Sequence, residues 1–294
     1  MKAMEGPTPG GGSPERWDHG RITELLLESG QRALALRGGL NCLLKEDCSL
    51  VTQADREIEA LFQEEFDHPE RGSFLIGEET VSQKGEEYLD AALEGATYVV
   101  DPIDGTSPYA HLLPNWGISI GRMQAGHLTD GGVYLPDYRL MVVSAGAAVL
   151  EGTREEGSTT WSWRELPAPR VETGPSGLVA ITQEIAKMGR VTLENPVQAL
   201  GAAVVPLVGI LTGRFLAYVG SVRLWDIAGS LPLLHRLNLS MTRLRAKPGT
   251  RLGLDVTKES YLLDPADSYR WGVRGGVLVC PASEEARLRR AFGF

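Results

Sequence analysis

The stretch that most constrains the fold of this chain is Val99-Val100-Asp101-Pro102-Ile103-Asp104-Gly105-Thr106, in which two acids stand three positions apart. The run before it, from Ala96 to Val100, is rich in β-branched and aromatic residues and predicts a strand. Pro102 has no N–H group and a fixed φ, so we expect the strand to end there. Gly105-Thr106 suits a tight turn or the start of a helix. Two acids at a strand end, followed by free backbone N–H groups, can bind a hard divalent cation beside a phosphate, which makes phosphate-ester chemistry the first hypothesis.

Length, charge and cysteine content narrow the class of protein. The chain has 294 residues, enough for one large domain or two ordinary ones, and its net charge of −9 argues against a nucleic-acid partner. Its cysteines, Cys42, Cys48 and Cys280, are odd in number and form no CxxC motif, which favours a reducing compartment. No apolar run reaches the roughly 18 residues that span a bilayer, and no apolar signal core is seen at the N-terminus. We therefore expect a cytoplasmic protein without a membrane partner.

The periodicity of apolar residues predicts two subdomains behind a disordered tail. Residues 1–15 are rich in Pro and Gly and are expected to be disordered. Residues 16–150 are predicted to form helices on a mostly antiparallel sheet, with helices at 16–36 and 52–66 and strands at 73–76, 96–100, 116–123, 133–135 and 140–144. The polar segment 151–177 marks a boundary. Residues 151–294 are predicted as a mixed α/β subdomain, with strands at 177–181, 215–219 and 276–280 and helices at 196–212, 226–237 and 283–292.

Three further acidic features accompany the first motif. Glu78-Glu79 follows a predicted strand and a glycine, Asp226 stands at a predicted helix start, and Asp55 opens another helix. Taken singly, a Glu-Glu pair is usually a solvated face and an Asp at a helix start is usually a cap. Asp101 and Asp104 alone could also form a turn in which an Asp side chain bonds its own backbone. Taken together in chain order, the acidic features at Asp55, Glu78-Glu79 and Asp226 and the Asp101-Asp104 motif indicate a functional site.

In their order along the chain these motifs resemble the inositol monophosphatase superfamily of magnesium-dependent, lithium-sensitive phosphatases. The resemblance extends from about Glu24 to Ala286. It rests on two signature motifs, Asp101-Pro102-Ile103-Asp104-Gly105-Thr106 and Trp225-Asp226-Ile227-Ala228-Gly229. It is supported by Leu50 to Asp55, Ile76 to Thr80, Gly117 to Gly121 and Leu200 to Ala203.

The resemblance implies two or three Mg²⁺ ions in each subunit, with Mn²⁺ as a possible substitute. It implies that Glu78, Asp101 and the carbonyl of Ile103 hold one ion, and that a third, weaker ion is held near Glu78. It also implies a second ion held by Asp101, Asp104 and Asp226, so that Asp101 bridges two ions. A ligand set made only of oxygens suits Mg²⁺ or Mn²⁺ better than Zn²⁺, and two ions can activate a water and stabilise the leaving oxygen.

The same resemblance assigns roles around the metals. Glu78 or its metal orients the attacking water, and Thr106, backed by Asp55, assists the deprotonation of that water. The substrate phosphate is held by the N–H groups of Gly105 and Thr106 at a helix start. Further implied roles are substrate contacts by Gly201, Ala203, Arg223 and Lys45 and support of the metal ligands by Glu79.

The substrate is left open by one departure from the family pattern. Inositol-specific members carry a Glu several residues before the second motif, where it binds ring hydroxyls. This chain has Tyr218-Val219-Gly220-Ser221-Val222 there, without an acid, followed by Arg223. In some relatives a basic residue at this place meets a second anionic group, whereas the plain alternative is an exposed surface arginine. We therefore expect a small phosphorylated metabolite, either inositol monophosphate or a related sugar or nucleotide phosphate.

Two other functions are kept open. A haloacid dehalogenase-type phosphatase carries a similar Asp-x-Asp-Gly-Thr motif, although here two residues separate the acids. A non-catalytic or dual-role partner-binding protein of the same fold is the other alternative. The fold that the resemblance implies is an α/β (α+β) sandwich layered αβαβα, sugar phosphatase-like and homodimeric.

Overall fold

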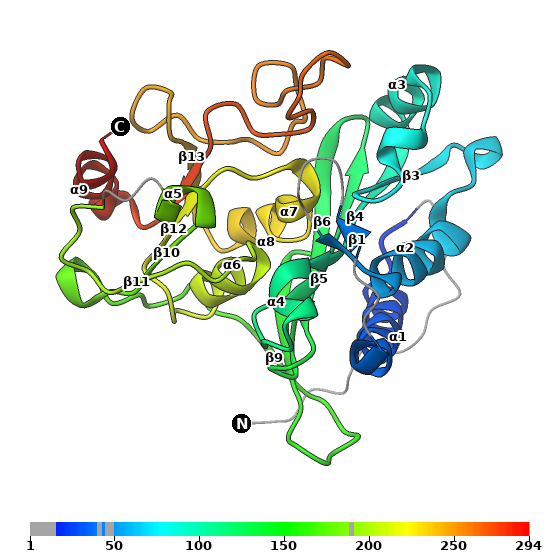
Figure 1. The fold of residues 1–294 in the computed structure, drawn as a ribbon, viewed down its shortest axis with the longest axis horizontal. Coiled ribbons are helices and arrows are strands. Elements are labelled where there is room, and N and C mark those ends of the chain that lie inside the picture. The colour runs from blue at the N-terminus through cyan, green and yellow to red at the C-terminus, as the bar shows by residue number, and fades with distance from the viewer. Residues whose placement is uncertain (1–15, 40–42, 45–49, 188–190, 294) are drawn as a thin grey trace.

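The computed structural model describes residues 16–39, 43–44, 50–187 and 191–293, and its elements are stacked in five layers. In Figure 1 the layers run from helices α1 and α2 at the right, through a large sheet, to helices α6, α7 and α8, then a small sheet and finally α9 at the left. One apolar core joins the large sheet to α1 and α2, another fills the space up to the small sheet, and a third lies beneath α9. The predicted αβαβα sandwich is thus confirmed.

The elements have the following bounds. The α-helices are α1 His19–Leu36, α2 Gln53–Phe66, α3 Glu86–Glu94, α4 Thr106–Ala110, α5 Gln183–Lys187, α6 Val204–Leu211, α7 Leu224–Ala228, α8 Leu231–Arg236 and α9 Ala282–Phe292. Short 3-10 turns are η1 Arg37–Gly39, η2 Pro69–Arg71, η3 Val81–Gln83 and η4 Gly174–Ser176. The strands of the large sheet are β3 Ser73–Gly77, β4 Ala96–Asp104, β5 Gly117–Gln124, β6 His127–Leu135, β7 Leu140–Ala145, β8 Ala148–Thr153 and β9 Ser162–Glu165. Those of the small sheet are β10 Val179–Ile181, β11 Val197–Gln198, β12 Ala217–Gly220, β13 Met241–Arg243 and β14 Val277–Val279, while β1 Leu43–Leu44 and β2 Leu50–Val51 pair with each other.

The large sheet runs in the order β3-β4-β5-β6-β7-β8-β9 and is antiparallel except for its first pair, β3 and β4, which is parallel. Helices cover both faces of β3 and β4, so every residue of these two strands is buried. Parallel neighbours end at the same edge of a sheet. The C-terminal ends of β3 and β4 therefore lie side by side, and the Glu78 N–H donates to the carbonyl of Val100 at 3.2 Å.

The prediction that the strand ends at Pro102 was wrong, because β4 continues to Asp104. The register of β4 against β5 shifts between the pairs Asp101–Ser119 and Asp104–Gly117. Pro102 lies inside this irregularity, where its missing N–H breaks no ladder hydrogen bond. The irregular segment carries both acids of the first motif at the C-terminal end of β4.

Two predicted helices are shorter than their apolar patterns suggest. The helix expected over 196–212 begins only at Val204, after Gly201, which has a positive φ of 79°, and an acidic side chain binds its first N–H groups. The helix expected over 226–237 is divided into α7 and α8, because Pro232 in the first turn of α8 has no N–H with which to continue α7. The other predicted strands and helices lie within a few residues of the observed ones, except that β6 begins at His127, well before the strand expected over 133–135.

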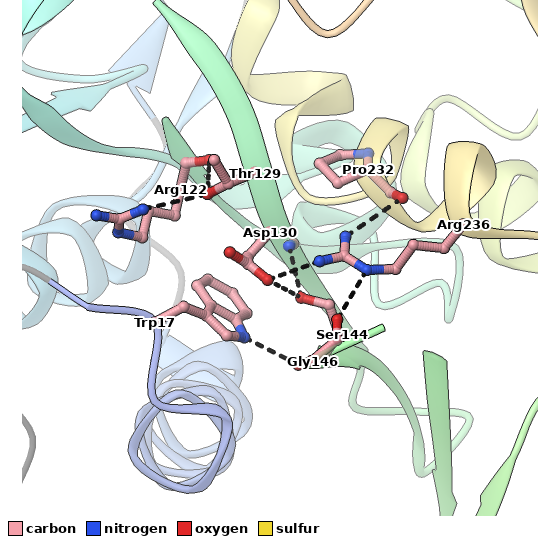
Figure 2. A network of polar contacts seen from close by, with 9 residues as sticks. Trp17, Arg122, Thr129, Asp130, Ser144, Gly146, Pro232 and Arg236 are labelled. Atoms are coloured by element: carbon pink, nitrogen blue, oxygen red, sulfur yellow. Dashed lines mark hydrogen bonds and ion pairs between the residues drawn. The ribbon is translucent and has the colours of Figure 1, made fainter. Parts of the chain in front are cut away.

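A polar network joins helix α8 to the large sheet and to the N-terminal end of α1 (Figure 2). Arg236 of α8 forms an ion pair with Asp130 of β6 at 2.8 Å, and Ser144 of β7 donates to the same carboxylate at 3.1 Å. The indole of Trp17 donates to the carbonyl of Ser144 at 2.9 Å. Both charged side chains are less than one fifth exposed, so solvent screens their attraction less than that of a surface pair. The network thus anchors the helix that follows the Asp226 motif.

The predicted division at residue 150 stays a proposal. Residue 150 lies within β8, and β9 pairs with β8 in the large sheet. Residues 1–15, for which disorder is expected, lie outside the described residues. Within the described ranges, no helix has the length and apolar character needed to cross a bilayer.

Candidate active site

The four predicted acidic ligands gather where β3, β4 and α7 meet. Asp101 and Asp104 occupy the irregular end of β4, and both are buried. Glu78 follows β3, the parallel neighbour of β4, and Asp226 lies in the first turn of α7, which packs on β4 and β5. The sequence places these acids far apart, and the parallel pairing together with the packing of α7 brings them into one electrostatic neighbourhood.

Burial and mutual repulsion raise the carboxyl pKa values of this cluster. Burial raises the pKa of Asp101 well above its usual range, and the charges of the neighbouring carboxylates raise it further. The pKa of Asp226 is raised by burial and by Asp104. The pKa of Asp104 is raised to about 7 by burial, and backbone N–H groups of α6 offset part of that effect. Such crowding of negative charge is relieved by a proton or by a cation.

The chemistry of these side chains fits a hard divalent cation. Their donor atoms are all oxygens, which Mg²⁺ and Mn²⁺ prefer. Among the described residues, no three His, Cys, Asp or Glu side chains form a group that could hold a metal ion as they stand. The acids repel one another without forming a closed ligand shell, and a shared cation would offset this repulsion.

The backbone of residues 201–204 is held against Asp104. The N–H groups of Ala203 and Val204 both donate to Asp104 Oδ2, the first at 2.7 Å. A side chain at Gly201 would come within about 3.0 Å of Pro108, and its φ of 79° favours glycine in any case. Gly201 and Ala203 thus lie beside the acidic cluster, and the Ala203 N–H is engaged by Asp104.

Helix α2 places Asp55 beside Thr106. Asp55 Oδ2 accepts a hydrogen bond from the N–H of Thr52 at 2.8 Å, which closes a capping box at the start of α2. Its other oxygen, Oδ1, lies 3.3 Å from the hydroxyl of Thr106, which also lies 3.1 Å from the carbonyl of Ile103. Asp55 is therefore both the N3 residue of the capping box of α2 and a hydrogen-bond partner of the predicted catalytic threonine. Thr106 begins α4, directly after Gly105, whose φ is 92°.

Two cavities open beside the acids. One, of about 250 Å³, is lined by Asp104 and Asp226 together with Gly201, Ala203, Tyr218, Ser221 and residues nearby. The other, of about 210 Å³, is lined by Glu78, Arg223, Trp225, Trp271 and neighbouring side chains. Asp104 and Asp226 thus line one cavity, and Glu78 lines the other.

Arg223 lies on the Glu78 side of the acidic cluster. Its guanidinium carbon is 4.6 Å from the ring centre of Tyr269 and 5.7 Å from that of Trp225, within the range of cation–π attraction. Its charge also counteracts the rise in the pKa of Asp226. The alternative of an exposed surface arginine is not what the structure shows, since Arg223 is only partly exposed and packs on two rings. Lys45 lies outside the described residues.

One acid of this region was not predicted. Glu59 of α2 is 1 % exposed and lies under the segment that carries Glu78 and Glu79. Its signal in the sequence is its place one turn after Asp55 and next to Ile58, on the apolar face of the predicted helix. A Glu on that face is unusual, because buried carboxylates need hydrogen-bond partners.

Known structures share this layered fold. The IMPase of Thermotoga maritima superimposes with a TM-score of 0.67 over 94 % of this chain and 97 % of its own, at 17 % identity. A structure described as 2′AMP-bound SaIMPase-II superimposes with a TM-score of 0.65 over 93 % of both chains, at 21 % identity. At these identities the likeness concerns the fold alone.

Residues 24–271 match the inositol monophosphatase family, and the chain belongs to that family. The inositol-1-monophosphatase of Bacillus subtilis is 28 % identical over 211 residues, which is 69 % of this chain and 76 % of the relative. Human inositol monophosphatase 1 is 23 % identical over 206 residues, which is 67 % of this chain and 72 % of the relative. The chain is thus a phosphoric monoester hydrolase of a metal-dependent family, and the haloacid dehalogenase alternative loses its support.

Proposed function

We propose that this chain is a Mg²⁺-dependent phosphomonoesterase that hydrolyses a small phosphorylated metabolite with water. The observation that carries the proposal is the cluster of mutually repelling carboxylates at the ends of β3 and β4, beside two cavities. Glu78, Asp101 and the Ile103 carbonyl would hold one ion, and Asp101, Asp104 and Asp226 a second. When bound, the ions supply an activated water and stabilisation of the leaving oxygen. Two or three ions per subunit, replacement by Mn²⁺, inhibition by Li⁺, a homodimer and a cytoplasmic location belong to the same proposal.

The residues of the chain have separate tasks in this mechanism. The Thr106 hydroxyl takes up a proton of the attacking water as its own proton passes toward Asp55 Oδ1, 3.3 Å away. The N–H groups of Gly105 and Thr106 bind phosphate oxygens. Glu78 orients the water, and Glu79 supports Glu78 through the backbone. The leaving alcohol occupies the cavity lined by Asp104, Asp226 and Ser221.

The walls of that cavity support a substrate choice beyond inositol. Among the residues that the structure describes, those that line it carry no charge apart from Asp104 and Asp226, and none of them is a further acid that would bind ring hydroxyls. Solved relatives are described with 2′AMP, with inositol monophosphate and with NADP bound. A screen with Mg²⁺ over inositol phosphates, fructose 1,6-bisphosphate, histidinol phosphate and adenosine 3′,5′-bisphosphate tests the proposal. Release of phosphate from none of them, while a purified relative acts in parallel, would contradict it.

We expect Mg²⁺ to raise the melting temperature. A ligand that binds only the native state stabilises it by about 1.4 kcal/mol per tenfold excess over its dissociation constant. Each kcal/mol corresponds to about 2–4 °C for chains of roughly this size. The pKa of Asp104 is raised to about 7 in the folded protein. In chelator, this carboxyl therefore contributes to the free energy of unfolding at low pH, and its contribution is lost as pH rises through that value. Scanning calorimetry should thus show the largest effect of Mg²⁺ above pH 7. A melting temperature equal in chelator and in millimolar Mg²⁺ would contradict the metal site.

We expect Arg223→Ala to change substrate choice. A guanidinium beside the cluster favours a substrate with a second anionic group, because charge-assisted bonds to phosphate are strong. The variant should lower kcat/KM for a bisphosphate more than for myo-inositol 1-phosphate, which we expect to be accepted but not preferred. Arg32→Ala, at an exposed arginine of α1, is the control. Equal losses for both substrates, or no loss, would remove Arg223 from the specificity residues.

A further inference from the structure

Glu59 is an acidic side chain on the buried, apolar face of α2, directly beneath the segment that carries Glu78. It lies one turn after Asp55 on the same helix, and both side chains are buried. Residues four positions apart share one face of a helix. Asp55 contacts Thr106, whereas Glu59 contacts the segment from Gly77 to Thr80.

The hydrogen bonds of Glu59 hold the backbone of this segment. Its Oε2 accepts from the N–H of Glu79 at 2.9 Å, and its Oε1 accepts from the hydroxyl of Thr80. Gln63, one turn further along α2, donates to the same hydroxyl at 3.0 Å. The carboxylate is therefore bonded to the residue immediately after Glu78 and to the next one.

Gly77 completes the contact from the other side of Glu78. A Cβ atom at this position would lie 2.3 Å from the carboxyl carbon of Glu59, and no real Cβ contact is that short. Gly77 thus allows the backbone to lie directly against the carboxylate. Gly77 and Glu79, the residues before and after Glu78, thus both contact the side chain of Glu59.

Stability alone does not explain a carboxylate here. Burying a charge costs free energy, and well-packed apolar residues are often at least as stabilising as buried charged groups. The negative charge of Glu78 is close enough to act on Glu59, which adds a further unfavourable contribution. A group kept in such surroundings points to a positional role for its hydrogen bonds.

We propose that Glu59 is a positioning residue that fixes the Glu78-Glu79-Thr80 segment so that the Glu78 carboxylate faces Asp101. This inference rests on the proposed function, because it assigns Glu78 to a cation. It gives α2 two tasks, in which Asp55 positions Thr106 and Glu59 positions Glu78. Partners behind metal ligands typically contribute about 10–100-fold in metal affinity.

The test measures the dissociation constant of Mg²⁺ from its effect on the melting temperature, together with kcat and KM at saturating Mg²⁺. Glu59→Ala should weaken Mg²⁺ binding by about 10–100-fold, and Thr80→Val, which removes one hydroxyl at constant shape, should weaken it several-fold. Glu59→Gln keeps one acceptor for the Glu79 N–H and should recover part of the affinity. The substrate KM should stay unchanged. Glu64→Ala, at an exposed acid on the same helix, should match the wild type.

The outcomes are distinguishable. If wild-type protein itself shows no Mg²⁺ response, the proposed function falls and this inference falls with it. If the wild type responds and folded Glu59→Ala and Thr80→Val both keep its Mg²⁺ affinity, the positioning role alone is overturned. If Glu59→Gln is as weak as Glu59→Ala while Thr80→Val is unchanged, charge rather than position acts, and the inference is overturned as well. Should Glu59→Ala not fold, Thr80→Val decides between the same results.

Discussion

Replacing Asp101 with Asn is expected to lower kcat/KM by about a thousandfold or more while leaving the protein folded. Asp101 lies at the centre of the acidic cluster, where four neighbouring carboxylates act on it. Losing the bridging charge weakens both proposed ion sites, and loss of metal stabilisation of a transition state costs several kcal/mol, with about 1.4 kcal/mol for each tenfold in rate. Steady-state kinetics of phosphate release measures this effect.

A stability measurement separates the chemical effect of Asp101→Asn from misfolding. Asn is nearly the same size and removes one repelling charge, so the melting temperature in chelator should equal or exceed that of the wild type. The rise on addition of Mg²⁺ should be largely lost. Asp90→Asn, at an exposed acid of α3, is the control and should behave as wild type. Activity of Asp101→Asn near that of the wild type in Mg²⁺ would refute the metal assignment.

Replacing Thr106 with Val is expected to lower kcat by about 100-fold or more, within the range of general acid–base contributions. The hydroxyl lies between Asp55 Oδ1 and the carbonyl of Ile103 and is the proposed acceptor of a proton from water. Val has nearly the same shape but no hydroxyl, so KM should change little. Thr106→Ser keeps the hydroxyl and should retain most of the activity. A kcat for Thr106→Val within a few-fold of wild type would remove Thr106 from the mechanism.

Local sequence patterns predicted the elements around the site well. The β-branched run before Asp101 predicted β4, and the ordered motifs of Glu78, Asp101 and Asp226 predicted acids that the fold brings together. This succeeded because each motif joins a regular element to a turn, and such junctions have strong local signals. The layered fold followed from the family resemblance rather than from these patterns.

Three of the failures have a common cause, which is tertiary contact, whereas the division of the helix expected over 226–237 follows from Pro232. Pro102 signals the end of a strand, but the irregular pairing with β5 accommodates it. The apolar run before α6 reads as helix from residue 196, whereas the carboxylate of Asp104 binds the N–H groups of Ala203 and Val204. Glu59 has no motif of its own, since its partners lie twenty residues away along the chain. Contacts of this kind leave little trace in a single sequence.

The most direct test of the central claim is release of inorganic phosphate by the purified chain, measured in chelator and then after restoring millimolar Mg²⁺. The substrate is myo-inositol 1-phosphate or the best substrate of the screen, and Asp101→Asn is the matched control. If the chain is a metal-dependent phosphatase, we expect almost no phosphate release in chelator, full recovery with Mg²⁺, and no recovery in Asp101→Asn. Equal phosphate release with and without Mg²⁺, or equal release by Asp101→Asn, would contradict it.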